Sequence, residues 1–141
     1  MATFSLQVVP ENAAEWLDTA RRAEAAGFDT LLTADHPGSC ATPFVALAAA
    51  AAVTTTIKLG SYVVNAGVRE PMLLAADVAT LDVVSGGRAV LGIGAGHTPA
   101  EWRRSVAAGR IRRAEWTGAS RWPRRPASCS PVKRSLWTVR T

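Results

Sequence analysis

The chain has 141 residues, enough for one domain around a single hydrophobic core, and a formal net charge of +5. That charge is uneven: residues 1–102 contain five Lys and Arg against ten Asp and Glu, whereas residues 103–141 contain eleven against one. The basic balance that would favour nucleic acid as a partner therefore belongs to the C-terminal segment alone.

Membrane, secretory and metal classes find no support in the sequence. The longest apolar run, residues 44–53, has ten residues, whereas a transmembrane helix needs about 20. No charged stretch followed by an apolar region marks a signal peptide at the N-terminus. Cys40 and Cys129 fit no metal-binding or disulfide spacing. We expect a cytoplasmic protein with no membrane partner and no metal.

Strand and helix signals alternate along residues 1–102. The run from Phe4 to Val9 is short, apolar and β-rich, and it predicts a first strand. Asn12 with Glu15 three residues later has the capping-box spacing of a helix start. Gly27 suits the position after that helix, where a left-handed backbone is common.

The same order repeats three times further along. The expected strands are Thr30–Ala34, Ile57–Val64 and Ala89–Ile93, and the expected helices are Phe44–Val53 capped by Thr42, Met72–Val84 opened by Glu70-Pro71, and one starting with a capping box at Thr98–Glu101.

This alternation predicts an α/β fold. The strands start about 25 to 32 residues apart, which is typical of right-handed βαβ units and a parallel sheet. Their nearly continuous apolar character suits a sheet covered on both faces. Periodicity leaves two folds open: a doubly wound open sheet, or half of an eight-stranded TIM barrel of about 250 residues.

Both histidines follow a predicted strand directly, His36 after the second and His97 after the fourth. The carboxyl ends of parallel strands meet at one edge, where ligands bind in barrels and in open sheets. A neutral imidazole there can exchange protons near pH 7. The alternative is that these are ordinary loop histidines, and that Asp35 folds its loop through an Asx turn.

Glycines stand at alternating positions at the end of the fourth strand and directly after it, at 92, 94 and 96. The dinucleotide fingerprint needs another glycine where His97 stands, so that match is weak. Two interpretations stay open: these glycines let the backbone approach a planar ligand, or they form a tight turn.

Three stretches together resemble one family: PENAAEWLDTARRAEAAGFDTLLTADHPG, IKLGSYVVNAGVREPMLLAADVATLDVVSGGR and AVLGIGAGHTPAEW. They look like the N-terminal half of luciferase-like oxidoreductases, and most like the branch that uses the deazaflavin coenzyme F(420). The resemblance covers about residues 3–102. It implies a partial (β/α)8 barrel of about four βα units, followed by a disordered or irregular basic tail.

The resemblance also implies a site at the C-terminal rim of the barrel. His36 matches a proton carrier beside the cofactor ring, and His97 stands where some relatives carry a catalytic glutamate. The residues that match cofactor contacts are Asp35 beside the ring, Tyr62 and Val63 in a bulge that often contains a cis peptide, Asn65 at the polar edge, and Gly94 and Ala95 beneath the ring.

The function implied by the resemblance is hydride transfer to or from a small organic substrate. Coenzyme F(420) is the expected cofactor and FMN is the alternative. In the family the cofactor phosphate is held by the second half of the barrel, which the resemblance does not reach. A second copy of the chain, in a homodimer, or the missing half would be needed to close the barrel. Four units alone leave the first and fourth strands as open edges.

Residues 103–141 form a second segment without helical or strand periodicity, and we divide the chain at Trp102. Interleaved Trp116, Trp122 and Trp137 suit a basic arm that binds single-stranded nucleic acid. A solvated extension is a second interpretation. We favour a third, out-of-frame translation from about codon 103, because a GC-rich gene read in a shifted frame yields this Arg, Pro, Ser and Trp bias. The chain would then be a truncated product without function.

Overall fold

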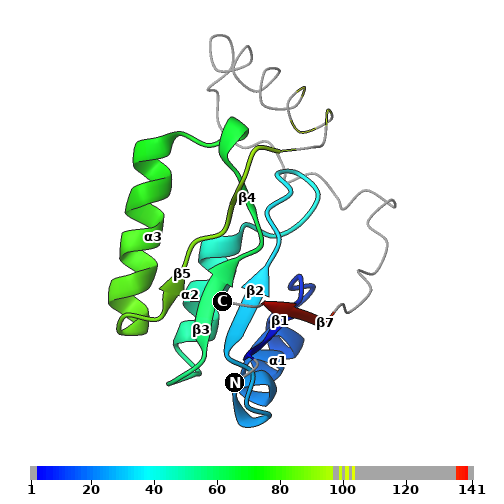
Figure 1. Cartoon of the computed structure of the whole chain (residues 1–141), viewed down its shortest axis with the longest axis vertical. Helices are drawn as coiled ribbons and strands as arrows, with labels where there is room; N and C mark the ends of the chain where they lie inside the picture. Colours follow the sequence, from blue (N-terminus) through cyan, green and yellow to red (C-terminus); the bar gives the residue numbers. More distant parts are fainter. Residues whose placement is uncertain (1–2, 97–98, 100, 102, 104–135, 140–141) are drawn as a thin grey trace.

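The computed structural model describes residues 3–96, 99, 101, 103 and 136–139. Its main sheet has five strands in the order β5-β3-β2-β1-β7 (Figure 1). The strands are β1 (Thr3–Gln7), β2 (Thr30–Thr33), β3 (Lys58–Ser61), β5 (Ala89–Val90) and β7 (Leu136–Val139). The first four are parallel and β7 runs antiparallel to β1. The parallel α/β fold expected from the sequence is therefore confirmed.

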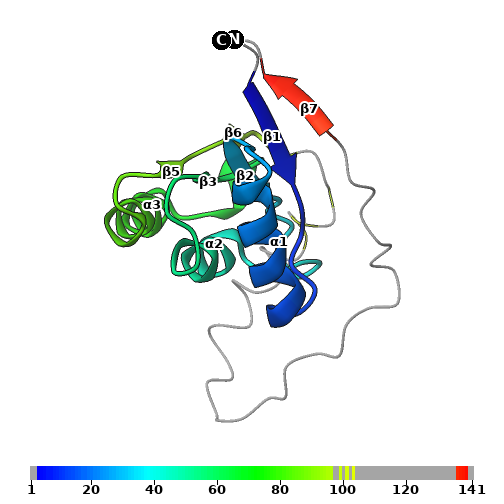
Figure 2. The ribbon, with the colours of Figure 1, turned by 90° about the horizontal axis from the view of Figure 1, so that it is seen from below.

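Helices cover one face of this sheet. They are α1 (Ala13–Ala25), α2 (Pro43–Ala51) and α3 (Pro71–Ser85), and they lie side by side below the strands in Figure 2. The core lies between them: Leu31 and Leu59 from the strands and Leu47 from α2 are fully buried. Burying a Leu side chain stabilises the fold by about 2 kcal/mol. Within the described part of the chain, no helix has the length and apolar character needed to cross a membrane.

The helix termini follow the sequence signals closely. The side chain of Asn12 accepts a hydrogen bond from the Glu15 amide at 2.9 Å, as in the expected capping box. After α1, Gly27 has a φ of +78°, and Phe28 donates back to the Ala23 carbonyl at 3.1 Å. This is a Schellman ending, in which a left-handed residue satisfies the last carbonyls.

One expected cap is wrong. Thr42 precedes α2 but makes no side-chain hydrogen bond to the first turn. Its hydroxyl oxygen instead accepts from the Arg69 guanidinium at 3.4 Å. Pro43 lacks an N–H, so the first turn has one donor fewer to satisfy. The helix therefore begins at the expected place without a side-chain cap.

The third and fourth expected strands each divide in two. After β3, the chain re-enters a ladder as β4 (Val64–Asn65), which pairs with β6 (Ile93–Gly94). Gly60 is paired with Val90, and Val64 is paired with Ile93. The segment from β3 to β4 therefore has one residue more between the two ladders than the segment from β5 to β6. This is a bulge, a local kink that redirects side chains. A short 3-10 helix, η1 (Ala66–Val68), follows β4.

Strand β7 occupies the outer edge of β1, which the sequence left unpaired. Thr3 to Leu6 are in register with residues 136–139. Those four residues belong to the basic segment for which no strand was expected. The division of the chain at Trp102 and the origin of the segment after it stay predictions.

Candidate active site

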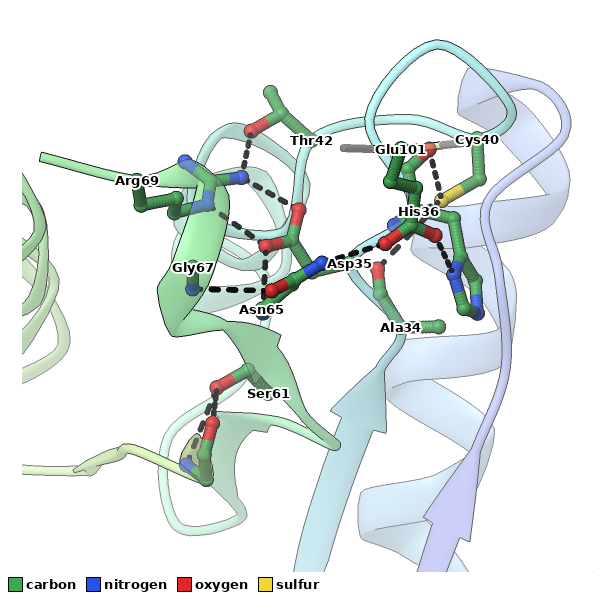
Figure 3. A network of polar contacts seen from close by, with 11 residues as sticks. Ala34, Asp35, His36, Cys40, Thr42, Ser61, Asn65, Gly67, Arg69 and Glu101 are labelled. Carbon is green, nitrogen blue, oxygen red and sulfur yellow. Dashed lines mark hydrogen bonds and ion pairs between the residues drawn. The ribbon is translucent and has the colours of Figure 1, made fainter. Parts of the chain in front are cut away.

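A cluster of polar side chains lies beyond the C-terminal ends of β2 and β4 (Figure 3). Asp35 follows β2 and is only 3 % exposed. Arg69, which follows η1, donates two hydrogen bonds to the Asp35 carboxylate, from Nε to Oδ2 at 2.8 Å and from Nη2 to Oδ1 at 2.6 Å. That hydrogen bonding raises the pKa of Arg69, so the guanidinium stays charged beside the buried carboxylate. The guanidinium also lies 5.8 Å from the centre of the Phe44 ring.

The neighbouring residue, His36, contacts a second carboxylate. Its Nδ1 atom is 2.7 Å from Oε1 of Glu101, which is only 4 % exposed. The imidazole itself is 44 % exposed. The ring therefore has one side against a buried carboxylate while much of it stays accessible to a ligand.

Asn65 at the end of β4 joins the two pairs. Its Nδ2 donates to Oε2 of Glu101 at 2.7 Å, and its backbone N–H donates to Oδ2 of Asp35 at 3.3 Å. Its Oδ1 accepts from the Gly67 amide at 3.1 Å. Asp35, His36 and Asn65, which the sequence placed at one rim, are thus brought together.

The bulge between β3 and β4 contains a cis peptide between Tyr62 and Val63, as the family resemblance implied. Both side chains are partly exposed, at 46 % and 39 %. The Ser61 hydroxyl fills the gap in the ladder: it donates to the Gly92 carbonyl at 3.1 Å and accepts from the Gly92 amide at 3.2 Å. Gln7 donates from Nε2 to the Tyr62 carbonyl at 3.0 Å, so β1 also fixes this bulge.

Close packing contacts, which could not be predicted from the sequence, explain the alternating glycines. A Cβ atom on Gly92 would lie 2.3 Å from the Ser61 carbonyl oxygen, and one on Gly94 would lie 2.6 Å from a Val63 methyl group. Contacts this short require glycine. The loop is therefore packed against the bulge itself, a third explanation beside the ligand and tight-turn interpretations.

The remaining predicted site residues fall in two groups. Gly94 lies in β6 and pairs with Asn65, and Ala95 is exposed directly after it. His97 lies outside the described residues, so its role stays a prediction. Asp35 has its visible role in the ion pair with Arg69, and its contact with a cofactor also stays a prediction. Within the described part of the chain no group of His, Cys, Asp and Glu is arranged to hold a metal.

Two residues of the cluster were not found from the sequence. Glu101 was interpreted as the last residue of a capping box, and its spacing after Thr98 gave no sign of a contact with His36. Arg69 was assigned no role, because nothing local connects it with Asp35, 34 residues earlier. One signal pointed toward Arg69. An Asp at the end of a buried strand needs a partner of opposite charge, and Asp35 has no Lys or Arg near it in the sequence.

The edge suits a planar, partly apolar ligand. Tyr62, Val63 and Ile93 expose apolar surface around the bulge. Gly94 and Gly96 pack closely against Val63 and Asn65, and His36 supplies a group that can carry a proton. The described residues therefore fit one part of a flavin-type ring site. They include no cluster of cations that would hold a phosphate.

Comparison with known proteins identifies the family. Residues 2–124 match the family of luciferase-like monooxygenases. The chain belongs to this family. The matched range continues 22 residues beyond Trp102, further than the resemblance seen in the sequence.

Individual relatives agree with the family. The chain is 35 % identical over 95 residues to a 5,10-methylenetetrahydromethanopterin reductase of Methanopyrus kandleri, covering 67 % of the chain and 27 % of the relative. It is also 35 % identical over 92 residues to 4-hydroxyprotoasukamycin monooxygenase of Streptomyces nodosus subsp. asukaensis, covering 62 % of the chain and 23 % of that enzyme.

Solved structures give the same fold. The coenzyme F(420) dependent tetrahydromethanopterin reductase from Methanopyrus kandleri superposes with a TM-score of 0.67 at 32 % identity, over 73 % of the chain and 29 % of the reductase. The oxygenating constituent of 3,6-diketocamphane monooxygenase from Pseudomonas putida, in complex with FMN, gives 0.68 at 24 % identity, over 74 % and 32 %. The chain thus spans less than a third of the length of these relatives.

Proposed function

We propose that the chain forms the ring-facing part of the active site of a deazaflavin- or flavin-dependent oxidoreductase, with coenzyme F(420) as the preferred cofactor and FMN as the alternative. The reaction is hydride transfer to or from a small organic substrate. The observation that carries the proposal is the partly exposed His36 ring on a buried carboxylate, at the same sheet edge as the Tyr62–Val63 bulge.

The family and one relative of known structure support this choice. The reductase from Methanopyrus kandleri is coenzyme F(420) dependent and 32 % identical to the chain. The diketocamphane monooxygenase was solved with FMN, but at 24 % identity it supports the fold alone. All these relatives are named as reductases or monooxygenases, which gives the nucleic-acid interpretation of the basic segment no support.

The roles of the residues follow from their positions. Tyr62 and Val63 back the ring with partly exposed apolar surface, and Gly94 and the exposed Ala95 lie beneath it. Bound there, the cofactor supplies the hydride acceptor or donor. His36 holds or releases the proton that accompanies the hydride, and its exposure lets the ring approach a ligand. Asn65 and His97 stay candidates for the polar edge and for a second acid or base.

The described residues form only part of a cofactor site. The relatives are three to four times longer than the matched segment. We propose that a second copy, or the second half of a barrel, completes the sheet and holds the cofactor phosphate, at backbone amides of helix N-termini that suit anions. We place the protein in the cytoplasm.

Cofactor titration tests this function. Purified chain is titrated with coenzyme F(420) and, separately, with FMN, and fluorescence and absorbance are recorded. Saturable changes with coenzyme F(420) are expected. Tyr62→Ala should weaken binding by about tenfold, or 1.4 kcal/mol.

The matched control is Met72→Ala, which removes a large apolar side chain of α3 that is more exposed than Tyr62 (78 % against 46 %) and should change nothing. Absence of any saturable change with both cofactors would contradict the proposal, and would favour a truncated product without function. Equal losses of cofactor affinity in the two variants would show that the Tyr62–Val63 bulge is not part of the cofactor site.

A further inference from the structure

Glu101 is a buried carboxylate that contacts the partly exposed imidazole of His36. Its Oε1 lies 2.7 Å from Nδ1 of His36, and its Oε2 accepts from Nδ2 of Asn65 at 2.7 Å. The two oxygens of one side chain thus join the end of β2 to the end of β4. A carboxylate with 4 % exposure requires such partners, because burial without them is costly.

The orientation of Asn65 defines the role of each Glu101 oxygen. Oδ1 of Asn65 accepts the Gly67 N–H at 3.1 Å, so the amide nitrogen must be the atom that faces Glu101. An amide nitrogen only donates, and Oε2 is therefore an acceptor. This leaves Oε1 in line with Nδ1 of His36. A carboxylate at that position accepts a hydrogen bond from an Nδ1–H group.

We propose that Glu101 is a positioning residue that holds neutral His36 in the Nδ1–H tautomer and so makes Nε2 its basic atom at the ligand-facing rim. The inference rests on the proposed function, in which His36 carries a proton. Which ring nitrogen of a histidine binds the proton is fixed by the partner of the other nitrogen. Without Glu101, the ring would also lose a contact that restricts its rotation.

The environment of the pair supports this assignment. Among the described residues, the charged groups beside it include Asp35, whose carboxylate is neutralised by the bidentate contact with Arg69. Cys40 adds a thiol that accepts from the His36 backbone amide at 3.3 Å. Asp35 is thus matched with Arg69, and His36 contacts Glu101 directly.

The tautomer can be measured without any cofactor. Two histidines are present in the sequence, so ring-nitrogen NMR of ¹⁵N-histidine-labelled protein gives two sets of signals, and His97→Asn assigns them. At about pH 9, well above the usual titration range of histidine, the wild-type His36 signals should show Nδ1–H as the major form. Glu101→Ala should make Nδ1–H the minor form.

Glu15→Ala is the matched control, because it removes an exposed carboxylate from the capping box of α1, and it should leave the His36 tautomer unchanged. A major Nε2–H form in the wild type would overturn the proposal even if Glu101→Ala does not fold. An unchanged tautomer in folded Glu101→Ala would overturn it too. Failure of cofactor binding would leave this measurement intact, so the two proposals fail separately.

Discussion

A Cβ atom on Gly96 would lie 2.3 Å from the Oδ1 atom of Asn65, so the glycine is packed directly against the amide that orients Glu101. The same glycine has a φ of +78°, in the left-handed region that L side chains rarely adopt. Backbone conformation and contact both demand glycine at this position. Gly96 therefore allows Asn65 to hold Glu101 in the position from which Glu101 contacts His36.

Gly96→Ala should destabilise the fold by about 2–4 kcal/mol, because it adds overpacking to the cost of a left-handed alanine. Gly27→Ala is the matched control: Gly27 also has a φ of +78°, but a Cβ there meets nothing within 4 Å. It should cost only about 1 kcal/mol. Urea denaturation measures both free energies of unfolding, and equal values would show that the contact with Asn65 is unimportant.

The ion pair between Asp35 and Arg69 gives a second prediction. The side chains are 2 % and 20 % exposed, and Asp35→Asn leaves the guanidinium without its carboxylate. Removing one partner of a buried pair costs about 3–5 kcal/mol. Asp18→Asn breaks the exposed pair with Arg22 and should cost less than about 1 kcal/mol. Urea unfolding of both variants gives the comparison, and similar losses would contradict a structural role for Asp35.

Glu24 makes stability depend on pH. Burial acts to raise its pKa, but backbone hydrogen bonds from Thr56, Ile57 and Thr55 and the Thr56 hydroxyl outweigh burial and lower the pKa from 4.5 to about 2. A pKa depressed on folding adds stability that is complete above about pH 4.5 and is lost as the pH falls through about 2. The carboxylate thereby fixes the segment before β3 to α1.

Glu24→Gln should lower the free energy of unfolding by about 1–3 kcal/mol at pH 7, after allowance for solvent screening. At about pH 3 the difference from wild type should fall to about half. Urea denaturation of both proteins across this range measures the difference. A gap that stays constant with pH would mean that the Glu24 charge has no part in it.

The order of the helices and strands could be predicted from local sequence signals. The arrangement of the candidate site depends on contacts between segments that are distant in the sequence. Asn12 and Gly27 act within a few residues, so both ends of α1 were predictable from the sequence. The bulge depends on Ser61 meeting Gly92, 31 residues away, and no periodicity contains that contact. His36 was found because strand ends share an edge, but Glu101, 65 residues later, carried a competing capping signal.

Arg88 joins the C-terminal ends of α2 and α3 and gives the last prediction. Its guanidinium donates five hydrogen bonds: Nε to the Ser85 carbonyl, Nη1 to the Thr54 hydroxyl and the Ile57 carbonyl, and Nη2 to the Ala51 and Thr54 carbonyls. These carbonyls lie at or after the helix ends, where the macrodipole favours a positive charge. The planar fork of arginine makes all five bonds possible at once.

Arg88→Lys keeps the charge but has three donors on one atom, so at least two of the five bonds are lost. Partly buried carbonyls left without a partner cost about 1–3 kcal/mol. Arg21→Lys, on the exposed face of α1, makes the same change and should stay within about 0.5 kcal/mol of wild type. Urea denaturation compares the two. Because a lysine retains the helix-end charge, an Arg88→Lys variant as stable as wild type would assign the stabilisation to charge rather than to the five hydrogen bonds.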